Sequence, residues 1–317
     1  MSTKKVLITD KVHSVLVDGL QKMGFEVIYD ESIKNEELAK CIDQLEGVII
    51  NSKIKMDRTM IDRATNLKFI GRLGSGLEII DVPYASAQNI HVINSPEGNR
   101  NAVAEHSVGM LLALMNNIVP ADRDVRNMEW QRELRRGVEL SGKTVGIIGF
   151  GHTGSAFASK LLNWNVELIT YDKYLDHLSP MYSYVKKVTL EDLQLEADII
   201  SFNLPLTEET IHFCDSKFIS GCKEGVILLN ASRGQVIETE ALIDNLANKK
   251  VGGACLDVFE NEKPSTFSSK EQKEYQMIYD FGNTVLTPHI AGWTKESLFE
   301  IASVLLEKIL ILYQDEV

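Results

Sequence analysis

Short apolar runs alternate with longer amphipathic stretches along the chain. Before residue 100, strand-length apolar runs occupy residues 6–9, 25–29, 47–51, 68–73 and 91–94. After residue 144 the rhythm restarts, with apolar runs at residues 145–149, 166–171, 197–202, 225–230, 252–258 and 284–287. Strands that alternate with helical stretches form parallel sheets whose faces are covered by helices. The pattern therefore predicts an α/β fold with two doubly wound parallel sheets.

Three further stretches do not have the length or pattern of a strand. Residues 101–119 are mostly small and apolar but contain Glu105 and His106, which favours a long buried helix over a membrane span. From residue 294 onward, apolar positions recur at intervals of three or four, which predicts a C-terminal helix. Residues 265–283 are polar and predict a long loop.

Composition narrows the class of protein. The 317 residues exceed what one hydrophobic core commonly supports, which predicts two domains. The net charge of -12, without a basic block, argues against nucleic acid and anionic membranes as partners. We expect neither a signal peptide nor a membrane span, because no apolar run is placed or long enough. The four cysteines show no C-x-x-C spacing, which is typical of reduced thiols in a cytoplasmic protein. These features favour a small-molecule partner and predict no metal site.

A glycine motif opens the second half. Gly149, Gly151 and Gly154 form G-x-G-x-x-G between a predicted strand and a predicted helix, where they allow a tight turn, close approach of a pyrophosphate and close packing. Asp172 ends the next strand, near the ~20-residue spacing at which a carboxylate meets the ribose 2′-hydroxyl. Such a carboxylate repels a 2′-phosphate, so NAD is predicted over NADP. The alternatives are a purely structural turn and a solvated Asp172, and the neighbouring Lys173 adds an opposite charge.

Three residues that follow apolar runs suit hydride-transfer chemistry. Arg233 follows a predicted strand, where ligands bind in open α/β sheets, and its guanidinium can hold a carboxylate through paired hydrogen bonds. His289 lies just beyond the last predicted strand, and imidazole exchanges protons near neutral pH. Glu262 can orient that imidazole and stabilise its charged form. Taken singly, each also fits a plainer role, as a solvated arginine, a structural histidine or a surface glutamate.

Residues 45–310 resemble the D-2-hydroxyacid dehydrogenase family. Its signature blocks occur in order as GRLGSGLEIID, NSPEGNRNAVAEH, ELSGKTVGIIGFGHTG, NLPLTEET, LLNASRGQVI, LDVFENEKP and LTPHIAGWT. Ordered blocks are far more specific than one glycine motif. The resemblance implies an enzyme in which Arg233 binds the substrate carboxylate and carbonyl, His289 protonates the carbonyl oxygen during reduction, and Glu262 keeps His289 basic.

The resemblance also implies a set of ligand contacts. The cofactor contacts would be Gly149, Gly151, His152, Thr153, Gly154, Asp172, Asn203, Pro205, Thr207, Ala231, Ser232, Arg233, Asp257, His289 and Gly292. The substrate contacts would be Lys53, Gly74, Ser75, Gly76, Arg233 and His289. Within these sets Asp257 would face the nicotinamide carboxamide. Asn203 stands where many relatives carry histidine, so a contact on the adenosine side differs.

The resemblance implies a division of labour between two domains. A flavodoxin-like substrate-binding domain would comprise residues 1–97 and 290–317, and a Rossmann NAD-binding domain residues 98–289. A hinged cleft would close around both ligands. The helix from Asn101 and the segment around Trp130 resemble the family's dimer arm, which predicts a homodimer.

The similarity is closest to short D-3-phosphoglycerate dehydrogenases of serine biosynthesis, in which Lys53 and Lys55 would meet the substrate phosphate. Asn51 stands where those enzymes often carry arginine, so glyoxylate or hydroxypyruvate reduction is the alternative. The chain leaves no room for a serine-binding regulatory domain, so serine feedback through one is not expected. An NAD(H)-sensing corepressor-like protein is an alternative of another class. Glu262 argues against formate dehydrogenase, which has glutamine there.

Overall fold

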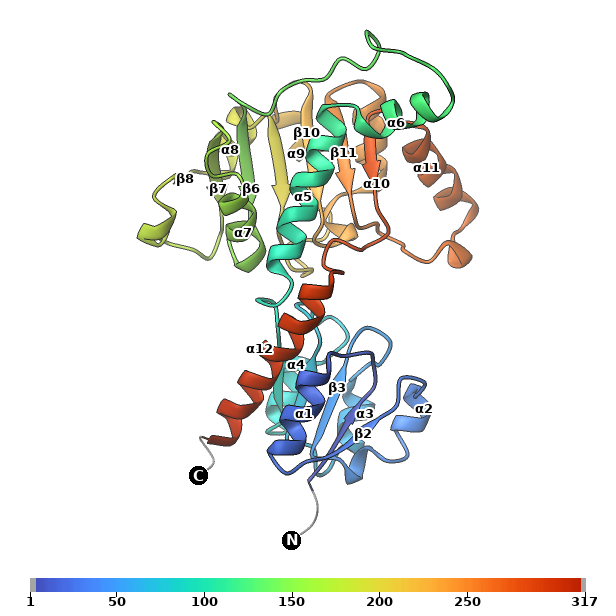
Figure 1. The fold of residues 1–317 in the computed structure, drawn as a ribbon, viewed down its shortest axis with the longest axis vertical. Coiled ribbons are helices and arrows are strands. Elements are labelled where there is room, and N and C mark those ends of the chain that lie inside the picture. Colours follow the sequence, from blue (N-terminus) through green and yellow to red (C-terminus); the bar gives the residue numbers. More distant parts are fainter. Residues whose placement is uncertain (1–3, 315–317) are drawn as a thin grey trace. The chain divides into compact units, whose positions relative to one another are not determined.

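The computed structural model describes residues 4–314, and these divide into two compact units. One unit comprises residues 4–100 and 293–314, and the other comprises residues 101–292 (Figure 1). Each boundary lies three residues beyond the predicted one. At the first, Gly98 packs against the backbone of Ile301 in its own unit. At the second, the Ile290 and Ala291 N–H groups donate to Asp257, so the segment after His289 belongs with the larger unit.

The smaller unit contains a five-stranded sheet. Its strands are β1 (Lys5–Ile8), β2 (Glu26–Tyr29), β3 (Gly47–Ile50), β4 (Phe69–Arg72) and β5 (His91–Asn94). They lie in the order β2-β1-β3-β4-β5 and all pair in parallel. This is the flavodoxin-like strand order, which confirms the predicted fold class for this unit.

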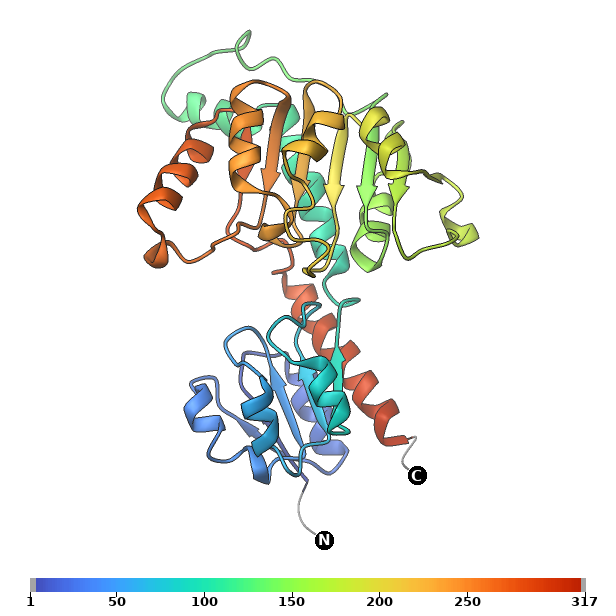
Figure 2. The ribbon, with the colours of Figure 1, turned by 180° about the vertical axis from the view of Figure 1, so that it is seen from behind.

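Helices cover both faces of that sheet. They are α1 (Ser14–Lys22), α2 (Asn35–Leu38), α3 (Arg58–Arg63), α4 (Val82–Ala87) and α12 (Lys295–Gln314), with a 3-10 turn η1 (Ile42–Gln44). The C-terminal helix packs with α1 over one face, where Leu16, Leu305 and Ile309 are buried (Figure 1). The other face is covered by α3 and α4 (Figure 2).

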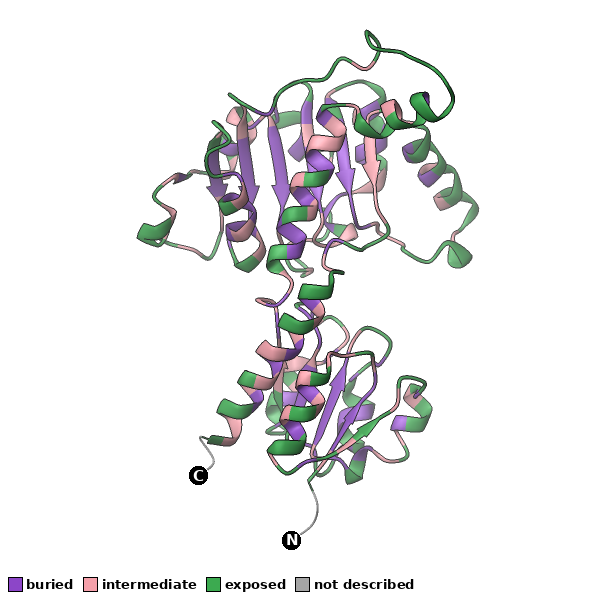
Figure 3. Cartoon of the chain, viewed as in Figure 1, coloured by how far each residue is buried: buried purple, intermediate pink, exposed green. Residues whose placement is uncertain are grey.

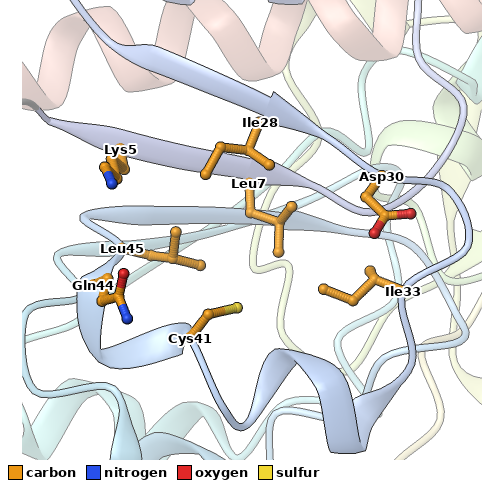
Figure 4. A pocket seen from close by; sticks show the side chains of 8 residues that line it. All are labelled: Lys5, Leu7, Ile28, Asp30, Ile33, Cys41, Gln44 and Leu45. Atoms are coloured by element: carbon orange, nitrogen blue, oxygen red, sulfur yellow. The ribbon is translucent and has the colours of Figure 1, made fainter.

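On the face of the sheet opposite α1, strand β2 is covered by the single-turn helix α2 and by η1. A cavity of about 230 Å³ remains there, and Figure 4 shows Leu7, Ile28 and Leu45 pointing into it. Its lining contains none of the residues predicted for the site.

The larger unit contains a seven-stranded parallel sheet. Its strands are β6 (Thr144–Ile148), β7 (Glu167–Tyr171), β8 (Val185–Lys187), β9 (Ile199–Phe202), β10 (Val226–Asn230), β11 (Val251–Leu256) and β12 (Thr284–Leu286). Their order is β12-β11-β10-β9-β6-β7-β8, which is the Rossmann order with one added strand. Strand β8 was not predicted, because its three residues carry two lysines and form no apolar run. Figure 3 shows that most strands of this sheet are buried.

Helices of the larger unit again lie on both faces. They are α5 (Arg100–Met115), α6 (Ile118–Arg126), α7 (His152–Lys160), α8 (Leu190–Glu196), α9 (Ser216–Gly221), α10 (Thr239–Ala247) and α11 (Ser269–Asp280), with 3-10 turns η2 (Pro180–Tyr182), η3 (Gly234–Val236) and η4 (Pro264–Thr266). One core lies under α5 and α7, and a second lies under α8, α9 and α10 (Figures 1 and 2).

Two predictions, one of a helix and one of a loop, were wrong in this unit. The helix predicted for residues 101–119 ends at Met115, because Asn117 takes a left-handed backbone conformation and a separate helix, α6, follows. The predicted loop 265–283 contains α11, which begins with a capping box between Ser268 and Glu271. Across residues 4–314, no single helix is long and apolar enough to cross a membrane; α5 and α6 together pass by length and composition, with a 63° bend between them.

Candidate functional site

The glycine-rich turn joins β6 to α7. Gly149 has φ +86°, and a Cβ there would lie 2.4 Å from the Asn203 carbonyl oxygen. A Cβ on Gly154 would lie 2.0 Å from the Gly149 carbonyl oxygen, so these two glycines are required by packing. A Cβ on Gly151 would meet no atom within 4 Å. The turn is therefore closely packed beneath Gly149 and Gly154 but faces open space at Gly151.

This geometry fits the pyrophosphate of a dinucleotide. Gly151 is the N-cap of α7 and has no side chain to accept from the first N–H groups of the helix. Uncapped N–H groups and the helix dipole favour an anion at such a terminus. His152 and Thr153, both predicted as cofactor contacts, are the first two residues of this helix.

Asp172 follows β7 beside the glycine turn. Its Oδ2 accepts a hydrogen bond from the Phe150 N–H at 2.8 Å, and its Oδ1 accepts one from the Tyr174 N–H at 2.9 Å. The carboxylate is therefore held next to the turn in a fixed orientation. An ionised carboxylate has about four acceptor positions, so it can also accept from a ribose diol.

The loop after β9 begins at the same edge of the sheet, since the Asn203 N–H donates to the Ile148 carbonyl. The Asn203 amide donates to the Ser201 hydroxyl at 3.1 Å, so the side chain folds back toward its own strand. The Thr210 hydroxyl donates to the Pro205 carbonyl at 2.6 Å and accepts from the Thr207 N–H at 2.8 Å. Thr210 thus holds together a loop whose Pro205 and Thr207 were predicted as contacts.

Arg233 lies in the turn after β10, following Ala231 and Ser232. The Ser232 N–H and hydroxyl donate to Asn230 Oδ1, and the Asn230 amide donates to the Arg233 carbonyl at 2.9 Å. A Cβ on Gly234 would lie 1.9 Å from the Phe259 carbonyl group. The missing side chain therefore lets the Arg233 turn pack against the segment that carries Glu262.

His289 and Glu262 form a hydrogen-bonded pair. His289 Nδ1 lies 2.8 Å from Glu262 Oε2, and Glu262 Oε1 accepts from the Phe259 N–H at 3.3 Å. The pair lies beyond the carboxyl ends of β11 and β12, which pair side by side in the sheet. Residues 27 positions apart in the chain are brought together despite the helix α11 between them.

The charges of this pair support each other. The hydrogen bond from Glu262 raises the pKa of the His289 imidazole against the opposing effect of burial. The negative charges of Glu262 and Asp257 raise it further, and the positive charge of Arg233 lowers it. Burial acts to raise the pKa of the Glu262 carboxyl, but its hydrogen bond and attraction to His289, with smaller effects of Phe259 and Arg233, outweigh burial and lower it. The arrangement favours an imidazolium beside a carboxylate.

Asp257 anchors the segment that carries His289. Its side chain is fully buried, and its carboxylate accepts from the Ile290 N–H at 2.9 Å and the Ala291 N–H at 2.8 Å. The His289 N–H donates to the Asp257 carbonyl at 2.7 Å. His289 has φ +56°, a left-handed conformation that costs a non-glycine residue about 1–3 kcal/mol. The hydrogen bonds to Asp257 hold this conformation, and Gly292 ends the segment and the unit.

Two residues near Asp257 were not predicted. The Thr287 hydroxyl donates to Asp257 Oδ1, and His106 Nε2 of α5 lies 3.0 Å from that hydroxyl. Thr287 stands in the TPHIAGW block, and His106 is an ionisable residue within an apolar helix. These two features of the sequence could have pointed to Thr287 and His106. The contact between the two residues, however, depends on α5 crossing the sheet.

The remaining predicted residues lie in the smaller unit. The Gly74 N–H donates to Ser95 Oγ at 3.1 Å, and the Asn94 amide donates to the Ser75 carbonyl at 2.8 Å, so the turn after β4 is held by the end of β5. Gly76 is buried in the same turn. The Lys53 ammonium donates to the Glu31 carbonyl and lies 4.0 Å from Asp10 Oδ1.

The chain is similar in sequence to known 2-hydroxyacid dehydrogenases. Residues 108–291 match the family model described as "D-isomer specific 2-hydroxyacid dehydrogenase, NAD binding domain". Hydroxypyruvate reductase of Thermotoga maritima is 35% identical over 309 residues, covering 98% of this chain and 98% of that protein. D-3-phosphoglycerate dehydrogenase of Archaeoglobus fulgidus is 33% identical over 305 residues, covering 96% of this chain but 56% of that protein. The chain thus spans little more than half the length of that relative.

Comparison with solved structures also finds 2-hydroxyacid dehydrogenases. The structure of D-lactate dehydrogenase from Aquifex aeolicus complexed with NAD and lactic acid matches with a TM-score of 0.83 and 25% identity, covering 98% of this chain and 96% of that one. Together with the match over residues 108–291, these similarities show that the chain belongs to the D-isomer specific 2-hydroxyacid dehydrogenase family and that its larger unit contains the NAD binding domain.

Proposed function

We propose that the protein is an NAD-dependent oxidoreductase that transfers a hydride between nicotinamide and C2 of a small D-2-hydroxy acid. The observation that carries this proposal is the His289–Glu262 pair, which stands at the carboxyl edge of the NAD-binding sheet. This edge is where ligands bind in open α/β sheets. The bound nicotinamide supplies the hydride in reduction and accepts it in oxidation.

The proton chemistry belongs to His289. Its Nδ1 is engaged by Glu262, and no hydrogen bond from the rest of residues 4–314 engages Nε2. In reduction, the imidazolium donates the Nε2 proton to the carbonyl oxygen as that oxygen gains negative charge. In oxidation, neutral Nε2 removes the proton from the hydroxyl group. Glu262 stabilises the imidazolium in both directions and keeps the ring oriented.

Arg233 is proposed to hold the substrate. A guanidinium binds a carboxylate through two parallel hydrogen bonds, which fixes the orientation of the keto acid as well as its position. The Arg233 turn is packed against the Phe259 carbonyl group at Gly234, so this cation is positioned by the backbone that also leads to Glu262. The smaller unit is proposed to bind the substrate through the turn at Gly74, Ser75 and Gly76.

Two kinds of substrate within this class are supported by different observations. D-3-phosphoglycerate, as in serine biosynthesis, is supported by the similarity to D-3-phosphoglycerate dehydrogenases. A smaller unphosphorylated acid such as hydroxypyruvate or glyoxylate is favoured by Lys53, because its ammonium donates to the Glu31 carbonyl and faces Asp10. A carboxylate near that lysine opposes a substrate phosphate.

The experiment is a panel of 2-keto and 2-hydroxy acids that includes D-3-phosphoglycerate, hydroxypyruvate and glyoxylate, assayed by NADH absorbance. We expect turnover with at least one member, and the ratios of kcat/KM identify the substrate. Lys53→Ala is expected to impair a phosphorylated substrate more than glyoxylate. NADH binding without turnover of any acid would contradict the enzyme proposal and favour a corepressor-like sensor.

Assembly and location are further parts of the proposal. We propose a homodimer that uses the helix from Asn101 and the Trp130 segment, where several apolar side chains are exposed. The exposed side chains of α6 and the following segment are Ile118, Val119, Val125, Met128, Trp130, Leu134 and Val138. We also propose a cytoplasmic location, which the four free cysteine thiols support.

A further inference from the structure

We propose that Glu209 is a specificity-determining residue for the cofactor, because it holds Lys173 in an ion pair and so withholds that cation from a 2′-phosphate. This inference deepens the NAD assignment of the same site and rests on it. The position of Lys173 alone would favour NADP over NAD. Lys173 directly follows Asp172, and a cation near the ribose carboxylate is the feature by which Rossmann sites accommodate NADP.

Three side chains form a cluster around one carboxylate oxygen. The Lys173 ammonium donates to Glu209 Oε2 at 2.8 Å, and the Tyr174 hydroxyl donates to the same oxygen at 2.7 Å. The ammonium also lies 5.4 Å from the centre of the Tyr174 ring. We call Lys173, Tyr174 and Glu209 the Glu209 cluster. It joins the segment after β7 to the loop after β9.

The Glu209 cluster is tied to the residue proposed for the ribose. Asp172 Oδ1 accepts from the Tyr174 N–H at 2.9 Å, while its Oδ2 accepts from the Phe150 N–H in the glycine turn. The backbone turn that orients the Asp172 carboxylate therefore also leads directly into the cluster. The side chains of Lys173 and Tyr174, the two residues that follow Asp172, both point toward Glu209.

Charge balance explains how the Glu209 cluster would act. An unpaired Lys173 would offset the repulsion between Asp172 and a 2′-phosphate. Paired with Glu209, the lysine contributes almost no net positive charge, so the repulsion by Asp172 remains. The hydrogen bond with Glu209 raises the pKa of Lys173, and the hydrogen bond with Lys173 lowers the pKa of Glu209, so both groups remain charged near neutral pH.

Exposure limits the size of the effect. The side chains of Lys173 and Glu209 are 57% and 55% exposed, and ion pairs of that exposure are weak and screened by salt. Loss of the pair is therefore expected to change affinity for a 2′-phosphate about two- to fivefold, with a larger effect at low ionic strength.

The test measures dinucleotide binding by the full chain and does not depend on turnover. Dissociation constants for NADH and NADPH are measured by fluorescence titration at low and high ionic strength. Glu209→Gln is expected to lower the Kd for NADPH about two- to fivefold at low salt and to leave that for NADH within about twofold. Glu209→Ala is a second variant with the same expectation. Adding Lys173→Gln to Glu209→Gln is expected to abolish the gain.

Glu196→Gln is the matched control. It neutralises a partly exposed carboxylate 3.9 Å from Lys186 Nζ, at the end of α8 and before the amino end of β9, so it changes net charge equally away from the glycine turn. We expect it to leave the NADPH to NADH ratio at the wild-type value.

Several outcomes would overturn the inference. An unchanged ratio in both Glu209 variants, or a gain that survives removal of Lys173 or also follows Glu196→Gln, would show that Glu209 does not act through that lysine. In those cases binding of NADH by the wild type would leave the NAD assignment intact. Wild-type protein that binds neither dinucleotide would overturn the NAD assignment together with the inference.

Discussion

At the scale of single residues, His289 combines an unusual backbone with an assisted side chain. Its left-handed φ of +56° is held by hydrogen bonds to Asp257, and its ring is held by Glu262. Strained conformations persist where the surrounding structure over-determines them, and they concentrate at functional sites. The backbone and side-chain constraints together leave Nε2 in one orientation, which is what proton transfer to a bound keto acid requires.

His289→Asn is expected to remove proton transfer while it preserves cofactor binding. General acid and base catalysis contributes about 10²- to 10⁴-fold, so kcat should fall by that amount. The dissociation constant for NADH should stay within about twofold, since the glycine turn and Asp172 are untouched. Steady-state rates and a fluorescence titration check both expectations. Retention of most turnover would contradict the role of His289.

Glu262→Gln is expected to shift the pH dependence of turnover. Glu262 raises the pKa of His289, so the variant should have a lower His289 pKa than the wild type. Reduction requires imidazolium and fails as pH rises through that pKa; its alkaline limit should therefore move to lower pH. Oxidation requires neutral imidazole, so its rise should also begin at lower pH. Profiles of kcat in both directions test this, and we expect a loss on the order of tenfold in reduction above neutral pH. Superimposable profiles would contradict it.

At the scale of elements, the site is built from the turns after parallel strands. The strands β6, β7, β9, β10, β11 and β12 all run in the same direction, so their carboxyl ends share one edge of the sheet. Gly149 and Gly234 then allow pairs of turns to approach more closely than any side chain would permit, at Asn203 and Phe259 respectively. Element identity was predictable here because the buried parallel strands read as apolar runs.

Other elements were not predictable from local pattern. Strand β8 is short and polar, so the apolar pattern does not indicate it. Its residues form a strand because they pair with β7. The break at Asn117 lies within a predicted apolar helix. It requires a left-handed backbone conformation, which residues other than glycine adopt uncommonly. Helix α11 is mostly polar, with only Tyr275 and Ile278 buried, so its amphipathic face is narrow.

Gly151 and Gly154 are expected to respond differently to alanine. Gly154→Ala places a Cβ 2.0 Å from the Gly149 carbonyl oxygen and should cost about 1–3 kcal/mol of unfolding free energy. Gly151→Ala meets no protein atom within 4 Å and should change that free energy by less than about 0.5 kcal/mol. It should nevertheless weaken NADH binding on the order of tenfold, because its methyl group blocks approach of the pyrophosphate. Denaturant unfolding and a binding titration separate the two effects. Equal NADH affinity in Gly151→Ala and wild type would count against the pyrophosphate site.

At the scale of the whole molecule, the two units use the same architectural principle with different strand orders. Each buries a parallel sheet between two layers of helices, and each forms its own hydrophobic core. In the larger unit, the segment after α6 carries exposed apolar side chains close together in the chain: Met128, Trp130 and Leu134 are 89%, 72% and 66% exposed. Clustered exposed apolar side chains mark interaction surfaces in soluble proteins.

Trp130→Glu is expected to weaken the proposed homodimer. A buried aromatic anchor contributes about 2 kcal/mol or more to an interface, so the dimer dissociation constant should rise at least about thirtyfold. Light scattering over a concentration series measures this. Met181→Glu, at a residue 70% exposed elsewhere on the same unit, is the control and should leave the mass unchanged. A monomeric wild type would end the dimer proposal.

The sequence by itself determined the fold class and the glycine turn, and it indicated Arg233, Glu262 and His289 as candidates, because strand runs, turn residues and ionisable groups are local properties. Tertiary structure alone decided which of these groups meet. The His289–Glu262 contact depends on β11 and β12 being neighbours, and the Asp257–Thr287–His106 network depends on α5 crossing their sheet. The ion pair between Lys173 and Glu209 likewise joins residues 36 positions apart. Periodicity records which face of an element is buried, but not which elements become neighbours, and that choice sets the contacts of every charged group at the site.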